Sequence, residues 1–302
     1  MLKKEYTFKT IKDNNLIMVK ASKSLFKINL ILLDTFSKHL SSKFHKSIAD
    51  CPNHIKAIII AKIVRMFHTL ELIVDKSRDE VSARCILRGL LDGITTYCFI
   101  YDRDDEDEIL FRHHLYTLDG FRCNKNSVVE CISENDKTKK DLKDKCDIVI
   151  NQIEDKLAEH PYSKEGKNAV KEIVRNANWK YKSLNDNKSW KFSEMYELVG
   201  FSKSIARYFQ GYLSQFSHGL CLSNTLRDDK ELLKAVLFES IVIEQKTINA
   251  IKSTFPKENW TKIVSSNSDS LMALLNNMEI KREEFMEFIN SRNLNDGILE
   301  MS

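Results

Sequence analysis

The chain has 302 residues, of which 42% are hydrophobic and 30% are charged, a balance that supports a sizeable core in a water-exposed protein. Only eight glycines and three prolines occur, which argues against a turn-rich β protein and favours long helices. The 47 Lys and Arg residues nearly balance 43 Asp and Glu residues, so the overall charge carries no strong signature of nucleic-acid binding, although a local patch stays open.

The cysteine pattern and the apolar stretches indicate the cellular compartment that we expect for the protein. Seven cysteines occur, an odd number, and none forms a Cys-x-x-Cys pair, so we expect reduced thiols in a cytoplasmic protein. The start of the chain has no apolar signal core. The longest apolar patch, near Ile58–Ile60, is too short and too interrupted to span a bilayer, so we expect no membrane partner.

The first half of the chain has a helical hydrophobic period. Apolar residues recur at this spacing over about 14–48, 54–75 and 78–101, and Pro52 separates the first two stretches. An acidic run at 104–108 predicts the start of a fourth helix, because carboxylates suit the positive end of the helix dipole. A metal-binding interpretation of this run is the alternative, but side chains at a helix start splay apart, so we expect no metal and no cofactor.

The second half is more polar at first and then apolar again. Further helices are expected over 136–160, 164–179, 192–199, 202–221 and 229–254. These patterns together predict an all-α protein, an antiparallel helical bundle with additional peripheral helices. We expect an N-terminal helix (1–52) packed on a bundle core (53–255), a polar helical insertion at about 123–188, and short C-terminal helices over 256–302.

Arg84, Arg88 and Asp92 lie on one line of the third predicted helix, at positions i, i+4 and i+8. An exposed face with an ion pair is the simplest interpretation. However, the neighbouring positions are small or semi-apolar, as at Gly89 and Gly93, which fits a surface covered by another helix. A buried Arg–Asp network and a functional site are therefore both open at this stage.

The helix predicted over 202–221 is the second candidate. Between Ser204 and Leu226 the single charged residue is Arg207, although a chain of this composition would place about seven charges there. Its polar face carries Ser214 and His218, which are i, i+4 neighbours able to share a hydrogen bond. A polar face without charges indicates contact with protein or with a cleft.

Three roles are open for this pair. His218 can be a structural histidine whose hydrogen bonds are satisfied, a contact to phosphate or substrate, or a base that activates Ser214. The third role lacks the strained strand-to-helix turn that exposes a nucleophilic serine in hydrolases.

Two segments also resemble a helical bacterial family of unknown function. The first is SARCILRGLLDGITTYCFIYDR, with arginines, Leu-Leu-Asp and an aromatic cluster. The second contains Trp190, a short helix ending at Gly200, and YFQGYLSQFSHG, which ends in a Ser-x-x-x-His pattern. The resemblance covers about residues 55–250.

That family is distantly similar to the HEPN superfamily of helical bundles, so the resemblance implies a HEPN-like core. Many HEPN proteins are metal-independent ribonucleases of toxin–antitoxin and antiviral systems, whose Arg and His residues meet at a dimer interface. His218 matches the histidine of their Arg-x(4–6)-His hallmark, whereas Leu213 or Ser214 stands where the arginine would. Arg88 or Arg84 would supply the missing charge if the two polar faces meet.

Two functional hypotheses follow. The first is an RNA-directed effector of a bacterial defence or toxin–antitoxin system, a ribonuclease with a degenerate motif. His218 would be its general acid/base, Arg88 or Arg84 would hold phosphate, and Ser214 and Asp92 would orient them. Its partners would be RNA, a protein of the same operon and a second copy of the chain. The alternative is a non-catalytic interaction or regulatory module of a defence complex, in which the same residues form a buried network.

Overall fold

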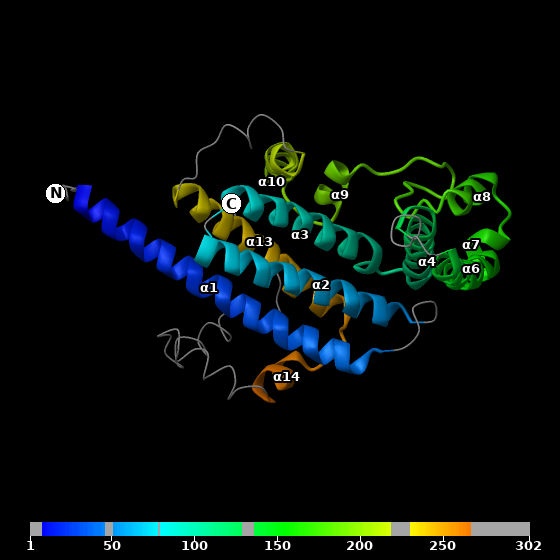
Figure 1. The fold of residues 1–302 in the computed structure, drawn as a ribbon, viewed down its shortest axis with the longest axis horizontal. Helices are drawn as coiled ribbons and strands as arrows, with labels where there is room; N and C mark the ends of the chain where they lie inside the picture. The colour runs from blue at the N-terminus through cyan, green and yellow to red at the C-terminus, as the bar shows by residue number, and fades with distance from the viewer. Residues whose placement is uncertain (1–7, 46–50, 78, 129–135, 219–229, 267–302) are drawn as a thin grey trace. The chain divides into compact units, whose positions relative to one another are not determined.

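The computed structural model describes residues 8–45, 51–77, 79–128, 136–218 and 230–266 (Figure 1). Within these residues the chain is helical almost throughout, and the extended pairing found there is an isolated antiparallel bridge between Tyr181 and Ser189. The predicted all-α class and helical bundle are confirmed. None of the described helices combines the length and the apolar character needed to cross a membrane.

The chain divides into two compact units, each discontinuous in sequence. The first unit comprises Met1–Lys43, Ile59–Ile94 and Tyr208–Ser302, and the second comprises Phe44–Ile58 and Thr95–Arg207. The predicted bundle core therefore contributes residues to both units. The boundaries expected from the sequence, at 52, 123–188 and 255, stay a prediction.

The first unit is built on long helices. They are α1 (Phe8–Lys43), the larger part of α2 (Pro52–Leu72), the larger part of α3 (Glu80–Tyr101), α13 (Lys230–Thr254) and the short α14 (Trp260–Ser266). Figure 1 shows α1, α2 and α3 alternating in direction, as expected of successive antiparallel helices. A π-helical turn, Ile73–Ser77, extends α2 at its end.

The hydrophobic period of α1 explains how it packs. Phe26, Leu33, Phe36 and Leu40 are spaced by three, four or seven residues, so they share one face, and all four are buried. The edge of the Phe26 ring meets the Phe67 ring of α2 at a centroid distance of 6.4 Å. This apolar stripe joins α1 to the rest of the unit.

Two glycines bring α2 and α3 close together. A Cβ atom added at Gly89 would lie 2.6 Å from the terminal carbon of Met66, and one added at Gly93 would lie 3.5 Å from Ile63. The small residues that suggested a covered helix surface are therefore in contact with α2. This half of α3 is packed against protein rather than exposed.

The second unit has shorter helices. They are α4 (Glu106–Cys123) with a following π turn (Asn124–Val128), α6 (Asp136–Glu159), α7 (Pro161–Lys164), α8 (Asn168–Arg175), α9 (Phe192–Leu198) and most of α10 (Lys203–Tyr208). The acidic run predicted to open a helix does so. The Asp105 side chain caps α4 by accepting from the backbone N–H groups of Asp107 and Glu108.

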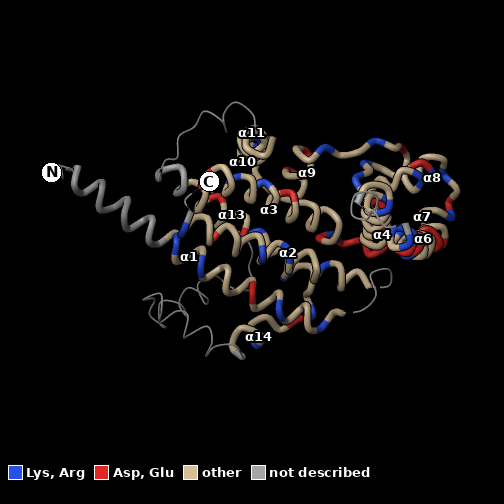
Figure 2. Tube along the Cα trace, viewed as in Figure 1, with Lys and Arg blue, Asp and Glu red and all other residues tan. Residues whose placement is uncertain are grey.

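Helix α6 is the exposed charged helix that the sequence predicts. Figure 2 shows Lys, Arg, Asp and Glu residues mixed along it. Its inner side carries Cys146, Ile150, Ile153 and Leu157, which are buried at spacings of three and four residues. This apolar stripe packs α6 beside α4.

Several predicted helix boundaries differ from the structure, including both ends of the first helix, predicted over 14–48 and found over Phe8–Lys43. Helix α1 ends at Lys43, and the carbonyl oxygen of Phe44 instead accepts a hydrogen bond from the His54 ring. The helix predicted over 164–179 is confined to Asn168–Arg175, because Gly166 takes a left-handed φ of 71° before it and Ala177 a φ of 46° after it. Chain reversals of this kind depend on local backbone geometry, which hydrophobic spacing does not report.

A buried histidine in the second unit has its protonation state fixed by its contacts. His160 caps α7: its Nδ1 accepts from the backbone N–H of Tyr162, and its Nε2 lies 3.1 Å from the carbonyl oxygen of Asp107, to which it donates. Only the neutral ring satisfies both contacts. Burial lowers the pKa of His160 below its ordinary value of 6.5.

We expect acid to destabilise the protein in part through His160. Its folded-state pKa lies below the unfolded one, so its contribution is present at neutral pH and is lost as the pH falls below about 6.5. The test compares urea unfolding of the wild type with that of His160→Asn, which retains a capping oxygen. Between pH 7.5 and pH 5, the free energy of unfolding should fall less in the variant than in the wild type. Equal losses of unfolding free energy in the two proteins would contradict this role of His160.

Candidate functional site

Arg84 is enclosed by carboxylates and aromatic rings from three segments of the first unit. Its side chain is 1% exposed. Its Nε donates to Glu80 at 2.6 Å, one turn earlier on α3, and its Nη1 donates to both Glu239 oxygens on α13, at 3.2 and 3.3 Å. The Tyr208 hydroxyl also donates to Glu239. We call Arg84, Glu80, Glu239 and Tyr208 the Arg84 network.

Two aromatic rings cover the guanidinium group of Arg84. Its central carbon lies 4.4 Å from the centre of the Tyr212 ring and 5.2 Å from that of Phe216, which is cation–π geometry. Burial disfavours the charged form of Arg84, but the carboxylates of Glu239 and Glu80 favour it more strongly. The pKa of Arg84 therefore lies above its ordinary value. Burial raises the pKa of the Glu239 carboxyl. A group so enclosed has a structural role.

Arg88 lies one turn further along α3 and makes a separate set of contacts. Its Nε donates to Asp92 at 3.0 Å, and its Nη1 donates to the Ser214 hydroxyl at 2.9 Å. The side chains of Arg88 and Asp92 are 16% and 34% exposed, so solvent reaches both. We call Arg88, Asp92 and Ser214 the Arg88 cluster. The two polar helix faces singled out in the sequence meet here.

His218 lies at the edge of this arrangement. It ends the short helix α11 (Ser214–Ser217), and its backbone N–H donates to the Ser214 carbonyl at 3.2 Å. Its side chain is exposed. The bond joining His218 to Ser214 is thus a backbone one, while the Ser214 hydroxyl accepts from Arg88. An exposed imidazole one turn from Ser214 can meet a ligand from solvent.

The helix predicted over 202–221 is interrupted. It consists of α10, a π-helical turn at Phe209–Leu213, and α11, and residues 219–221 lie outside the described part of the chain. A π turn adds one residue to a helical turn and changes which side chains face a neighbour. The turn contains Gly211, the one sequence signal for it, since glycine weakens an α-helix.

The structure groups the five predicted site residues into two sets. Arg88, Asp92 and Ser214 lie together with His218 at their edge, whereas Arg84 belongs to the buried network. Sequence reasoning missed Glu239 and Tyr208, which come from distant parts of the chain. Among the described residues, no group of three or more His, Cys, Asp or Glu side chains is placed to hold a metal ion.

Comparison of the chain with protein-family models, with curated proteins and with solved structures finds no match. A guanidinium group bonded to the Ser214 hydroxyl, with an exposed imidazole one helical turn beyond Ser214, provides donors for an anion and a side chain of the type used in general acid–base catalysis.

The two arginines should differ sharply when each is replaced. Arg84→Met leaves Glu80 and Glu239 buried without their cation, and we expect a loss of roughly 3–5 kcal/mol in the free energy of unfolding. Arg88→Met, the matched change one turn away at a solvent-accessible position, should cost about 1 kcal/mol or less. Urea titrations followed by circular dichroism measure both. Equal losses would contradict the division into a structural and a functional arginine.

Proposed function

We propose that the protein is an RNA-directed effector of a bacterial defence or toxin–antitoxin system, with its RNA site at the Arg88 cluster and His218. One observation carries the proposal: Arg88 of α3 reaches the Ser214 hydroxyl, and His218 stands exposed one turn beyond it. Asp92 orients the Arg88 guanidinium group from the other side. The resemblance to HEPN-like proteins supplies the substrate class.

The proposed chemistry needs no metal. The 2′-oxygen of a ribose bonds to the adjacent phosphorus while the bond from phosphorus to the 5′-oxygen breaks. One imidazole takes the 2′ proton and an imidazolium returns a proton to the 5′-oxygen. Arg88 stabilises the charge on the phosphate oxygens. A homodimer would supply a second His218, so that one copy acts as base and the other as acid.

Aromatic side chains on the segment that carries Ser214 favour a single-stranded substrate. The Tyr208 ring is 42% exposed and stacks on Tyr212, with centroids 5.2 Å apart and 16° between the planes. Tyr212 in turn meets the edge of Phe216. Unpaired bases stack on exposed rings of this kind, whereas paired bases present only their edges.

The second candidate is a non-catalytic interaction module. It is favoured by the contacts that Arg88 makes inside the protein, to Asp92 and Ser214. In that case the Arg88 cluster orients α3 against α11, and a protein partner encoded in the same operon binds the exposed surface around it.

The two candidates differ in what the replacement of His218 does. We expect purified protein to cleave cellular RNA at unpaired positions without added metal, and His218→Ala to slow cleavage by about 100-fold or more, the usual contribution of a general acid/base. Arg88→Met should weaken binding of a labelled single-stranded RNA in fluorescence anisotropy.

His45→Ala is the matched control, because His45 is also exposed and lies in the other unit. It should behave as the wild type in both assays. RNA profiles that are identical with wild type, with His218→Ala and without protein would contradict the ribonuclease proposal and favour the interaction module.

A further inference from the structure

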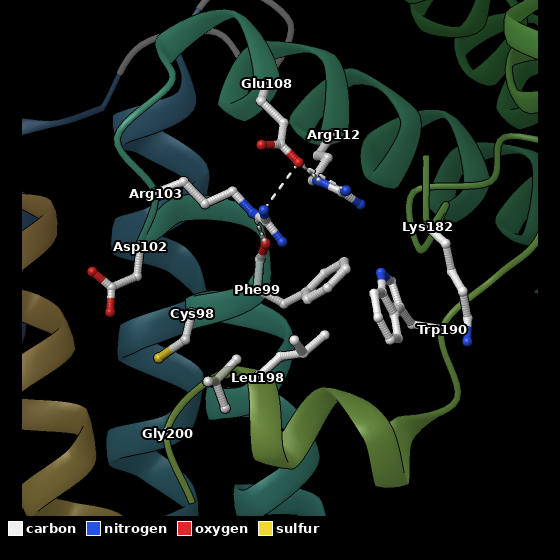
Figure 3. Close-up of a pocket in the computed structure, with 11 residues that line it drawn as sticks. Cys98, Phe99, Asp102, Arg103, Glu108, Arg112, Lys182, Trp190, Leu198 and Gly200 are labelled. Carbon is white, nitrogen blue, oxygen red and sulfur yellow. Dashed lines mark hydrogen bonds and ion pairs between the residues drawn. The ribbon is translucent and has the colours of Figure 1, made fainter. Parts of the chain in front are cut away.

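The second unit contains a cavity of about 420 Å³ that the proposed function does not use (Figure 3). It is bounded by the end of α3, the start of α4, the segment that carries Lys182 and Trp190, and the end of α9. Ligand cavities in proteins are roughly 300–1,000 Å³, so this one has room for a small metabolite. All of its lining residues belong to one unit.

Two arginines in the cavity wall share one carboxylate. Arg103 Nη1 and Arg112 Nε donate to the same Glu108 oxygen, at 2.9 and 2.8 Å. Figure 3 shows Glu108 between the two guanidinium groups, while Asp102 points away from them. Burial, together with the charge of Arg103, lowers the pKa of Arg112. The lining holds two carboxylates, Asp102 and Glu108, and the two guanidinium groups share Glu108, so this pair carries one more positive charge than the carboxylate that bonds to it.

The two arginines differ in accessibility. Arg112 is buried, and its Nη groups donate to the backbone carbonyls of Trp179 and Tyr181. The Arg103 side chain is 25% exposed, and its contacts within the described chain use Nε, to the Phe99 carbonyl, and Nη1. Its Nη2 group is therefore available to a ligand. Arg112 fixes Glu108, and Arg103 is the arginine that a bound anion would meet.

A second cation, Lys182, lines the cavity beside Trp190. The Lys182 ammonium group lies 4.3 Å from the centre of the Trp190 ring and 2.9 Å from Glu194. Its side chain is 30% exposed. An anion in the cavity would compete with the exposed Glu194 carboxylate for this ammonium group.

Flat and apolar surfaces complete the lining. The central guanidinium carbons of Arg103 and Arg112 lie 4.7 and 4.6 Å from the centre of the Phe99 ring. Figure 3 shows the Phe99 ring pointing toward Trp190. Leu198 borders the same space and is 53% exposed. Gly200 has a left-handed φ of 95°, which turns the chain sharply at the end of α9. Rings and aliphatic groups beside cations suit a ligand with both a flat part and a charged part.

We propose that this cavity binds a small organic anion with a flat ring, of the size of a nucleoside monophosphate. The ring lies against Trp190 and Leu198, and the anionic group accepts hydrogen bonds from Arg103, while Lys182, which stands over the Trp190 ring, adds positive charge nearby. A metal ion does not suit the site, because Glu108 already bonds to two guanidinium groups. A purely apolar ligand does not suit it either, because it would desolvate the charges without pairing them.

Isothermal titration calorimetry of the full-length protein tests the proposal. The probes are the four ribonucleoside monophosphates, the corresponding nucleosides, ribose 5-phosphate and inorganic phosphate. We expect at least one nucleoside monophosphate to bind with a Kd of about 1 mM or tighter, and its nucleoside and its phosphate part to bind at least about tenfold more weakly. Ribose 5-phosphate separates the contribution of the ring from that of the sugar.

Two variants locate the binding site. Arg103→Met and Trp190→Leu should each weaken binding at least about tenfold. Arg175→Met makes the same change as the first variant at an exposed arginine of the same unit that does not line the cavity, and it should bind as the wild type does. Circular dichroism identifies variants that fail to fold, and Trp190→Leu keeps the test valid if Arg103→Met does so.

Three results would overturn the proposal: no binding of any nucleoside monophosphate to the wild type at about 10 mM, binding of inorganic phosphate as tight as that of the whole nucleotide, or binding unchanged in folded Arg103→Met and Trp190→Leu. Neither variant touches the Arg88 cluster or His218. A negative result here therefore leaves the RNA proposal standing, and loss of RNA cleavage in His218→Ala leaves this one standing.

Discussion

The first unit depends on the burial of one positive charge. Arg84 is 1% exposed, and a guanidinium group removed from water to this extent is tolerated only if carboxylates and further hydrogen bonds replace its hydration. Glu80 and Glu239 supply that replacement, and Tyr208 uses the remaining acceptor capacity of Glu239. The contacts join α3, α13 and the segment that begins at Tyr208. The relative positions of these three elements are therefore constrained at one point.

The candidate site is a consequence of this constraint. Arg84 and Arg88 are one turn apart on α3, so when Arg84 is held between Glu239 and the Tyr212 ring, Arg88 is brought to Ser214. The π turn at Phe209–Leu213 carries Tyr212, which covers Arg84, and leads directly into Ser214, which bonds to Arg88. Arg84 thus acts as a positioning residue for the Arg88 cluster, and it is too deeply buried to touch a ligand itself.

The sequence predicted most of this fold because helices of this length leave a clear hydrophobic period. The i, i+4 relation of Arg84, Arg88 and Asp92 is visible without coordinates. The partner of Arg84 on α13 was not predictable, because Glu239 is 155 residues away and looks like any surface glutamate. The π turn was missed because hydrophobic spacing assumes 3.6 residues per turn throughout.

The cavity of the second unit escaped prediction for a related reason. Arg103, Glu108 and Arg112 look like ordinary surface ion pairs at spacings of four and five residues. Only the fold adds Lys182 and Trp190, which lie about 70 or more residues further along the chain. Sites assembled from separate elements, each with unremarkable local sequence, need the tertiary structure to be recognised.

The central claim, that the Arg84–Glu239 ion pair determines how these elements pack, is tested most directly by a double-mutant cycle. The free energy of unfolding in urea would be measured for the wild type, Glu239→Gln, Arg84→Met and the combined variant. We expect Arg84→Met to cost less in the Glu239→Gln background, by a coupling energy of about 1–3 kcal/mol. A cost for Arg84→Met that is the same in both backgrounds would contradict it.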